Sequence, residues 1–215
     1  MTPTNAQINL FEAATPAVHS FSLPLPGGDA VFFGSFFSTE ESDRLLIVLE
    51  QETKWRQEKI KFYGKEIDIP RLTAWYGDSG KTYTYSGIRN EALPWTPTLA
   101  LIKDRIEAVA GASFNSVLLN FYRSGKDGVA WHSDDEPELG PEPTIGSVSF
   151  GGTRCFQFKS KIRTDLDRVD LDLTHGSLLV MRGLTQRNWQ HQIPKTKKPV
   201  SSRINLTFRK IAKFD

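Results

Sequence analysis

Residues 203–209 read R-I-N-L-T-F-R and alternate strictly between polar and apolar side chains. In a β-strand, such alternation places the two kinds of side chain on opposite faces. The apolar face is Ile204, Leu206 and Phe208, and the polar face is Arg203, Asn205, Thr207 and Arg209. A strand with one wet face has this pattern, but two guanidinium groups flanking an amide and a hydroxyl also suit a carboxylate. The segment therefore predicts a strand and leaves open whether its polar face meets solvent or an anion.

Six further segments in the second half of the chain have strand character, with turn residues between them. They are S-V-L-L-N-F-Y (116–122), T-I-G-S-V-S-F (144–150), C-F-Q-F-K (155–159), R-V-D-L-D-L (168–173), S-L-L-V-M (177–181) and W-Q-H-Q-I (189–193). In the first of them, Asn120 and Tyr122 share a face. Many short strands after two helices are typical of a β-sandwich or jelly roll with helices on one face. We therefore expect an α+β, mainly β fold of this kind.

Capping residues predict where two helices begin and where the second one ends. Ser38 opens a capping box, S-T-E-E, in which Glu41 would reach back to the cap. Thr96 and Pro97 suit the N-cap and first residue of the second helix, and Gly111 suits its end. The second helix is expected to carry an apolar stripe made of Leu99, Ile102, Ile106 and Val109.

The composition is ordinary for a globular protein, with 39% hydrophobic and 24% charged residues and a formal net charge of +2. Any interaction with nucleic acid would therefore depend on local basic clusters. One cluster lies at 59–71, in a segment that predicts a hairpin turning near Gly64. Its basic residues are Lys59, Lys61, Lys65 and Arg71. They would follow phosphates, or they are simply a solvated surface.

Residues 1–28 contain several Pro, Thr, Ala and Gly, and we expect a flexible N-terminal extension before one domain at 29–215. The single cysteine, Cys155, excludes an internal disulfide and indicates a reducing compartment. No apolar run approaches the ~20 residues that span a bilayer, and the N-terminus lacks a signal-peptide pattern. We therefore expect an intracellular protein with no membrane partner, cytoplasmic, or nuclear in a eukaryote.

The stretch W-H-S-D-D-E, residues 131–136, places three acids beside a histidine. In an extended segment His132 and Asp134 point the same way, so both could bind one metal ion. H-x-D alone is a weak signal, and His191 in W-Q-H-Q-I would strengthen it from a neighbouring strand. Two histidines and one carboxylate are the ligand set of non-haem Fe(II) oxygenases.

Five short motifs follow one another along the chain between residues 120 and 209. They are N-F-Y-R-S-G-K-D-G-V-A-W-H-S-D-D-E-P (120–137), S-V-S-F-G (147–151), H-G-S-L-L-V-M (175–181), W-Q-H-Q-I-P (189–194) and R-I-N-L-T-F-R (203–209). Together they resemble the AlkB family of Fe(II)/2-oxoglutarate-dependent dioxygenases, and most of all the branch that repairs double-stranded DNA. The resemblance extends from about Lys61 to Ile211. It implies a double-stranded β-helix, or jelly-roll, core at about 115–211 and a nucleotide-recognition region at about 55–90.

The resemblance also implies roles for individual residues. The iron ligands would be His132, Asp134 and His191. The 2-oxoglutarate contacts would be Asn120, Tyr122, Arg203, Asn205, Thr207 and Arg209, with the distal carboxylate on Arg203. Contacts to the damaged nucleotide would come from Tyr63, Arg71, Tyr83, Tyr85, Asp135 and Glu136. Asp135 would also pair with Arg209, and Tyr63, where phenylalanine is usual, would wedge into the base stack.

The activity implied is oxidative demethylation of 1-methyladenine and 3-methylcytosine in DNA, using Fe(II), 2-oxoglutarate and O2. The cosubstrate would leave as succinate and the methyl group as formaldehyde. Methylation makes these bases cationic, so acids beside the pocket would favour them over normal bases. We expect a monomer that acts on alkylated DNA, single- or double-stranded, with RNA as a further substrate class. The alternatives are a 2-oxoglutarate oxygenase acting on RNA, protein or a small molecule, and a metal-free binding module.

Overall fold

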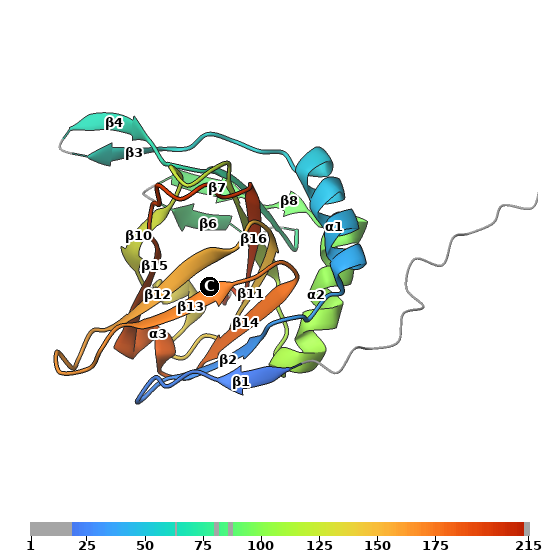
Figure 1. The fold of residues 1–215 in the computed structure, drawn as a ribbon. Helices are drawn as coiled ribbons and strands as arrows, with labels where there is room; N and C mark the ends of the chain where they lie inside the picture. The colour runs from blue at the N-terminus through green and yellow to red at the C-terminus, as the bar shows by residue number, and fades with distance from the viewer. Residues whose placement is uncertain (1–18, 63, 80–81, 86–87, 213–215) are drawn as a thin grey trace, which may run out of the picture.

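The protein is described by a computed structural model at residues 19–62, 64–79, 82–85 and 88–212 (Figure 1). Most of the expected flexible extension, residues 1–18, lies outside these ranges. None of the helices within them is long and apolar enough to cross a membrane.

Two β-sheets form the body of the described part of the chain. The eight-stranded sheet has the order β1 (Ser20–Ser22), β2 (Asp29–Phe33), β14 (Ser177–Arg182), β11 (Ile145–Gly151), β16 (Arg203–Arg209), β9 (Ser116–Tyr122), β5 (Leu72–Gly77) and β8 (Leu93–Pro94). The four-stranded sheet has the order β10 (Val129–His132), β15 (Trp189–Ile193), β12 (Arg154–Ser160) and β13 (Val169–Leu173). Seven of these strands, β9 and β11 to β16, coincide with the segments expected from the sequence, and the other five were not expected. The jelly-roll prediction is confirmed.

Two hairpins stand apart from the sheets in the described ranges. One pairs β3 (Lys59–Phe62) with β4 (Lys65–Asp68) and turns at Gly64, whose φ of 76° lies in the left-handed region as the turn requires. The other pairs β6 (Thr82–Tyr85) with β7 (Ile88–Glu91). Figure 1 shows the β3–β4 hairpin projecting from the body of the molecule. The predicted hairpin is thus confirmed.

The helices α1 (Thr39–Glu52) and α2 (Pro97–Ala110) lie side by side against the large sheet (Figure 1). The Ser38 hydroxyl accepts a hydrogen bond from the Glu41 amide at 3.2 Å, as predicted. The Glu41 side chain does not reach back to the cap, because its carboxylate pairs with Arg105 of α2 at 2.5 Å.

The second helix also begins and ends where expected. The Thr96 hydroxyl accepts from the Leu99 amide at 3.2 Å, and Gly111 ends the helix with a φ of 64°. One residue of the predicted stripe is wrong: Val109 is 39% exposed, and Ala110 is buried instead. Ala110 lies eleven residues after the buried Leu99, close to three full helical turns, so it returns to the same face.

A first hydrophobic core lies between the helices and the large sheet, and a second lies between the two sheets. Ile204, Leu206 and Phe208 of β16 belong to the first core and are fully buried. The second core includes Leu179 of the large sheet and Phe158 of the small one. The polar face of β16 is therefore directed between the sheets.

Part of the expected extension packs with the domain. β1 pairs antiparallel with β2, and Leu23 and Leu25 are buried in the second core. Residues 20–25 therefore pack with the domain although they precede residue 29, and the boundary itself stays a prediction.

Candidate active site

The two candidate histidine ligands come from neighbouring strands. β10 and β15 are antiparallel, and His132 and His191 are register partners. Their ring centroids are 4.3 Å apart. Asp134 follows β10 in a turn and points inward, so the ligand atoms of all three residues lie within 4.8 Å of one another. The structure thus brings together the three residues that the sequence proposed as metal ligands.

Each histidine is held in a form suited to bind a metal ion. His132 Nδ1 lies 2.8 Å from the Ala130 carbonyl oxygen, which can only accept, so this contact favours the tautomer with the proton on Nδ1 and Nε2 available to a metal ion. His191 is 3% exposed and stacks on Phe156 with ring centroids 5.0 Å apart. Burial, assisted by nearby positive charge, lowers the pKa of His191 from 6.5 to about 3. Its ring is therefore neutral at physiological pH.

The candidate carboxylate ligand is almost completely buried and is fixed on two sides. The Asp134 amide donates to Gln186 Oε1 at 2.9 Å, and its Oδ1 accepts from the Arg209 guanidinium. Burial opposes ionisation, but Arg209 and the two histidines outweigh it and lower the pKa of Asp134. The carboxylate is therefore charged and directed at the histidines, with Oδ2 3.7 Å from His191 Nε2.

The polar face of β16 lines the same cavity as these three residues. Asn205, Thr207 and Arg209 line it, together with Asn120 and Tyr122 of β9. All seven residues of β16 are buried, so the interpretation as a half-exposed strand is wrong. Asn205 donates to Ser147 Oγ at 2.9 Å, and Thr207 lies 3.1 Å from Asn205 Oδ1. A polar surface formed by β9 and β16, with its own hydrogen bonds, therefore faces the candidate metal site.

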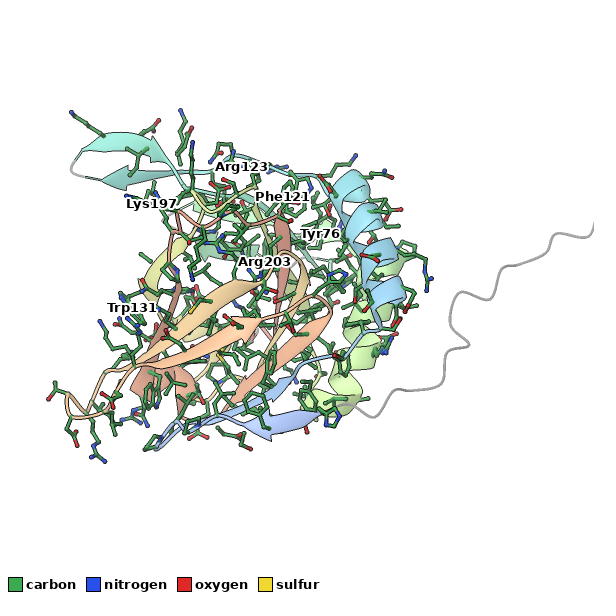
Figure 2. The ribbon with its side chains drawn as sticks, in the orientation of Figure 1. Tyr76, Phe121, Arg123, Trp131, Lys197 and Arg203 are labelled. Atoms are coloured by element: carbon green, nitrogen blue, oxygen red, sulfur yellow. The ribbon has the colours of Figure 1, made fainter. Side chains whose placement is uncertain are left out.

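The remaining member of the polar face, Arg203, is 1% exposed and lies against Tyr122, which lines the cavity. Figure 2 shows Arg203 inside the body of the molecule. Its Nη2 donates to Ser149 Oγ at 2.9 Å, and its guanidinium carbon is 5.2 Å from the ring centroid of Tyr122. Burial lowers the pKa of Arg203 to about 10, so it stays charged. Its buried Nε and Nη1 make no hydrogen bond with the described residues. These two donors suit a carboxylate, because leaving donors of a buried cation without acceptors costs free energy.

These features can be compared with known proteins. A family model described as the 2OG-Fe(II) oxygenase superfamily matches residues 20–209. The human protein named alpha-ketoglutarate-dependent dioxygenase alkB homolog 3 is 44% identical over 207 residues, which is 90% of this chain and 70% of that protein.

The chain belongs to the AlkB family of 2-oxoglutarate- and Fe(II)-dependent oxygenases.

Other relatives agree with this assignment. The human DNA oxidative demethylase ALKBH2 is 42% identical over 184 residues, covering 81% of this chain and 70% of that protein. The solved structure reported as "The structure of OsALKBH1" matches with a TM-score of 0.58 and 19% identity, over 84% of this chain and 96% of that one. At that identity it supports the fold alone. Neither relative's name specifies single- or double-stranded DNA, so the double-stranded-DNA branch stays a prediction.

A groove continues from the cavity of this AlkB-family oxygenase towards the β3–β4 hairpin. His132 and Glu136 line both, and Ile60 of the hairpin and Trp131 of β10 line the groove alone. Figure 2 shows Trp131 at the edge of the molecule. The groove has a volume of about 570 Å³, within the roughly 300–1,000 Å³ of ligand sites. It is the candidate route from the surface to the metal ligands.

One prediction for a residue near the groove stays open, and one needs correction. Arg71 is 5% exposed, donates to Asn120 Oδ1 at 2.6 Å and lines both the cavity and the groove, so its contact to a nucleotide stays a prediction. Asp135 does not pair with Arg209, because the turn after β10 directs Asp134 to that arginine instead. Asp135 is exposed and pairs with Lys161 at 2.9 Å.

The other residues predicted to contact the nucleotide have mixed outcomes. Glu136 lines both the cavity and the groove. Tyr63 lies outside the described residues. Tyr83 and Tyr85 belong to β6, but their side chains are outside the described part. Their contacts to a nucleotide stay predictions.

Sequence reasoning missed three polar residues that support the site. Ser147 bonds Asn205, Gln186 holds the Asp134 amide, and Arg154 bonds the two loops at one end of the ligand strands. The S-V-S-F alternation could have revealed Ser147, since it shares a face with Ser149. Gln186 and Arg154 give no local signal, because their partners lie 52 and 27 to 40 residues away.

Proposed function

We propose that this enzyme demethylates N-alkylated bases, such as 1-methyladenine and 3-methylcytosine, in DNA. The observation that carries this proposal is the convergence of His132, Asp134 and His191 in one cavity with the polar face of β16. The human relative named DNA oxidative demethylase ALKBH2 supports DNA as the substrate, and the relative named alpha-ketoglutarate-dependent dioxygenase alkB homolog 3 supports the cosubstrate.

The three converging residues would hold Fe(II). His132 and His191 offer neutral imidazole nitrogens, and Asp134 offers a charged oxygen, which is the set of non-haem Fe(II) oxygenases. When bound, iron with 2-oxoglutarate and O2 supplies the oxidation of the N-methyl group, with succinate, CO2 and formaldehyde as the other products. Arg209 orients the Asp134 carboxylate by its hydrogen bond to Oδ1 and leaves Oδ2 directed to the metal.

The cosubstrate would lie against β9 and β16. The buried guanidinium of Arg203 has unused donors that suit the distal carboxylate of a diacid. Asn120, Tyr122, Asn205 and Thr207 add neutral hydrogen-bonding groups along the same wall. These groups bind and orient the diacid, and the hydrophobic walls around them exclude water.

The substrate base would enter through the groove beneath the β3–β4 hairpin. A base inside a duplex cannot reach a buried metal site, so it must leave the stack. Glu136 lines the path from the groove to the metal ligands. Its charge would favour a cationic methylated base over a neutral normal one. Lysines of the hairpin, such as the exposed Lys59 and Lys65, would contact phosphates.

The direct test is incubation with Fe(II), 2-oxoglutarate and oligonucleotides that carry 1-methyladenine or 3-methylcytosine, as single strands and duplexes. We expect loss of one methyl mass, with formaldehyde and succinate formed in equal amounts. Succinate formation without loss of methyl from any oligonucleotide would contradict the proposal. RNA strands with the same lesions, run in parallel, test the alternative that RNA is the preferred substrate.

A further inference from the structure

A buried arginine outside the predicted site connects several parts of it. Arg154, the first residue of β12, is 3% exposed. Its Nη2 donates to the carbonyl oxygens of Asp127 at 2.9 Å and Pro194 at 2.7 Å, and its Nη1 donates to that of Ser124 at 3.3 Å. One guanidinium fork therefore joins three backbone carbonyls.

These carbonyls belong to the loops that flank the metal-ligand strands. Ser124 and Asp127 lie just before β10, which carries His132, and Pro194 directly follows β15, which carries His191. The Thr196 amide donates to the Gly125 carbonyl at 2.8 Å, so the two loops are in contact. Gly125 permits this approach, because a Cβ there would be 2.4 Å from the Thr196 carbonyl oxygen. Arg154 thus holds the ends of both ligand strands together.

The same guanidinium also contacts a wall of the cosubstrate cavity. Its central carbon lies 5.7 Å from the ring centroid of Tyr122, and that of Arg203 lies 5.2 Å from the same centroid. A cation near an aromatic ring favours a fixed ring orientation. The position of the Tyr122 ring therefore depends on Arg154 as well as on Arg203.

Burying the Arg154 guanidinium costs free energy of folding, so stability alone does not explain this residue. No carboxylate bonds Arg154 directly in the described part of the chain, since the Asp127 carboxylate is taken by Arg123 at 2.7 and 3.0 Å. Burial lowers the pKa of Arg154 accordingly. Replacing a buried charge by a packed apolar side chain is often neutral or stabilising. A cation at this position is better explained by what its fork holds in place.

We propose that Arg154 is a positioning residue that sets the distance between the metal ligands and the Tyr122 side of the cosubstrate site. The inference rests on the proposed use of Fe(II) and 2-oxoglutarate, but not on the nature of the methylated substrate. Loss of the fork would leave loops 123–128 and 194–196 joined by the Thr196–Gly125 hydrogen bond without the guanidinium, so that His132, His191 and Tyr122 are held less firmly in the positions that meet the diacid together.

The test compares Arg154→Met and Arg154→Lys with wild type and with Arg163→Met, which removes an exposed arginine paired with Asp165. Binding of 2-oxoglutarate is titrated without O2 or nucleic acid, using the visible absorption of its Fe(II) chelate. We expect Arg154→Met to weaken binding about tenfold, as for other groups that support metal ligands. Arg154→Lys should fall between it and wild type, because an ammonium keeps the charge but cannot span three carbonyls.

Hydrogen–deuterium exchange of the metal-free proteins provides a second reading. We expect faster exchange confined to loops 123–128 and 194–196 in both Arg154 variants and no change in Arg163→Met. If Arg154→Met melts earlier but binds 2-oxoglutarate like wild type, with unchanged exchange in both loops, the arginine is only structural and the proposal fails. If Arg154→Met does not fold, Arg154→Lys decides by the same two readings. Failure of oligonucleotide demethylation affects neither measurement.

Discussion

The two faces of β16 are both buried, yet they serve different purposes. Ile204, Leu206 and Phe208 pack towards the helices in a hydrophobic core, while the alternate side chains face the space between the sheets. Burial stabilises the first face at about 25 cal/mol per Å² of apolar surface. On the polar face, burial costs free energy, and hydrogen-bond partners such as Ser147, Ser149 and Asp134 offset this cost. Substitutions on the apolar face should therefore change stability, and substitutions on the polar face should change the binding of 2-oxoglutarate.

The largest effect is expected at the metal ligands opposite the polar face. Asp134→Ala removes the carboxylate ligand, so we expect no bound Fe(II) and no succinate formation. Asp135→Ala is the matched control, because that neighbouring carboxylate is exposed and pairs with Lys161. Metal content and succinate release measure both variants. Equal iron content in the two variants would show that Asp134 is not a ligand.

A large loss of stability is expected on the apolar face. Phe208→Ala removes a fully buried ring packed against Trp95 and Phe114, and we expect a loss of about 3–5 kcal/mol in the free energy of unfolding. Thr207→Val changes the opposite face at nearly constant volume, so it should alter stability less and 2-oxoglutarate binding more. Denaturant unfolding and ligand titration separate the two effects. If Thr207→Val destabilises the protein more than Phe208→Ala does, the two faces do not have these different roles.

A smaller effect is expected from the buried arginine of the polar face. Arg203→Met keeps the length of the side chain and removes its donors, so 2-oxoglutarate binding should weaken by about 2 kcal/mol or more. Because the substitution also removes a buried charge, stability should change little. Titration of the Fe(II) protein with 2-oxoglutarate, and with a monocarboxylate lacking the distal group, measures this. Equal weakening for both ligands would assign Arg203 to another part of the diacid.

The smallest effect is expected at the mouth of the cavity. Glu136→Gln removes a charge near the base without changing shape, and we expect the preference for cationic 3-methylcytosine over neutral 3-methylthymine to fall by about 1 kcal/mol. The ratio of kcat/KM values for the two bases measures this preference. Glu138→Gln, two residues away in the short helix Pro137–Leu139, is the control. An unchanged ratio in Glu136→Gln would exclude charge selection by this residue.

Many of the strands and the clustering of His132 with Asp134 could be predicted because their signals are local. Alternation in R-I-N-L-T-F-R fixes which residues share a face, and H-x-D places two ligands on one side of an extended segment. His191 was proposed as a ligand from a neighbouring strand, and in the structure its strand does pair with that of His132. The chemistry of the polar face therefore followed from period-2 spacing once the strands were recognised.

What could not be predicted depends on contacts across the fold. Alternation does not say whether a polar face meets water or a cavity, so β16 was equally compatible with solvent exposure. Arg71 looks basic and exposed beside the hairpin lysines, but it reaches Asn120, which is 49 residues away. The choice between Asp134 and Asp135 as the partner of Arg209 depends on the turn after β10, which spacing alone does not define.

The central claim is that one Fe(II) ion lies between His132, Asp134 and His191 beside the buried arginines. A crystal structure of the protein soaked anaerobically with Fe(II) and 2-oxoglutarate, with anomalous data collected at the iron edge, tests it most directly. We predict a single strong peak within bonding distance of all three side chains and the distal carboxylate of the diacid at Arg203. A peak elsewhere, or a diacid bound away from β16, would contradict the account.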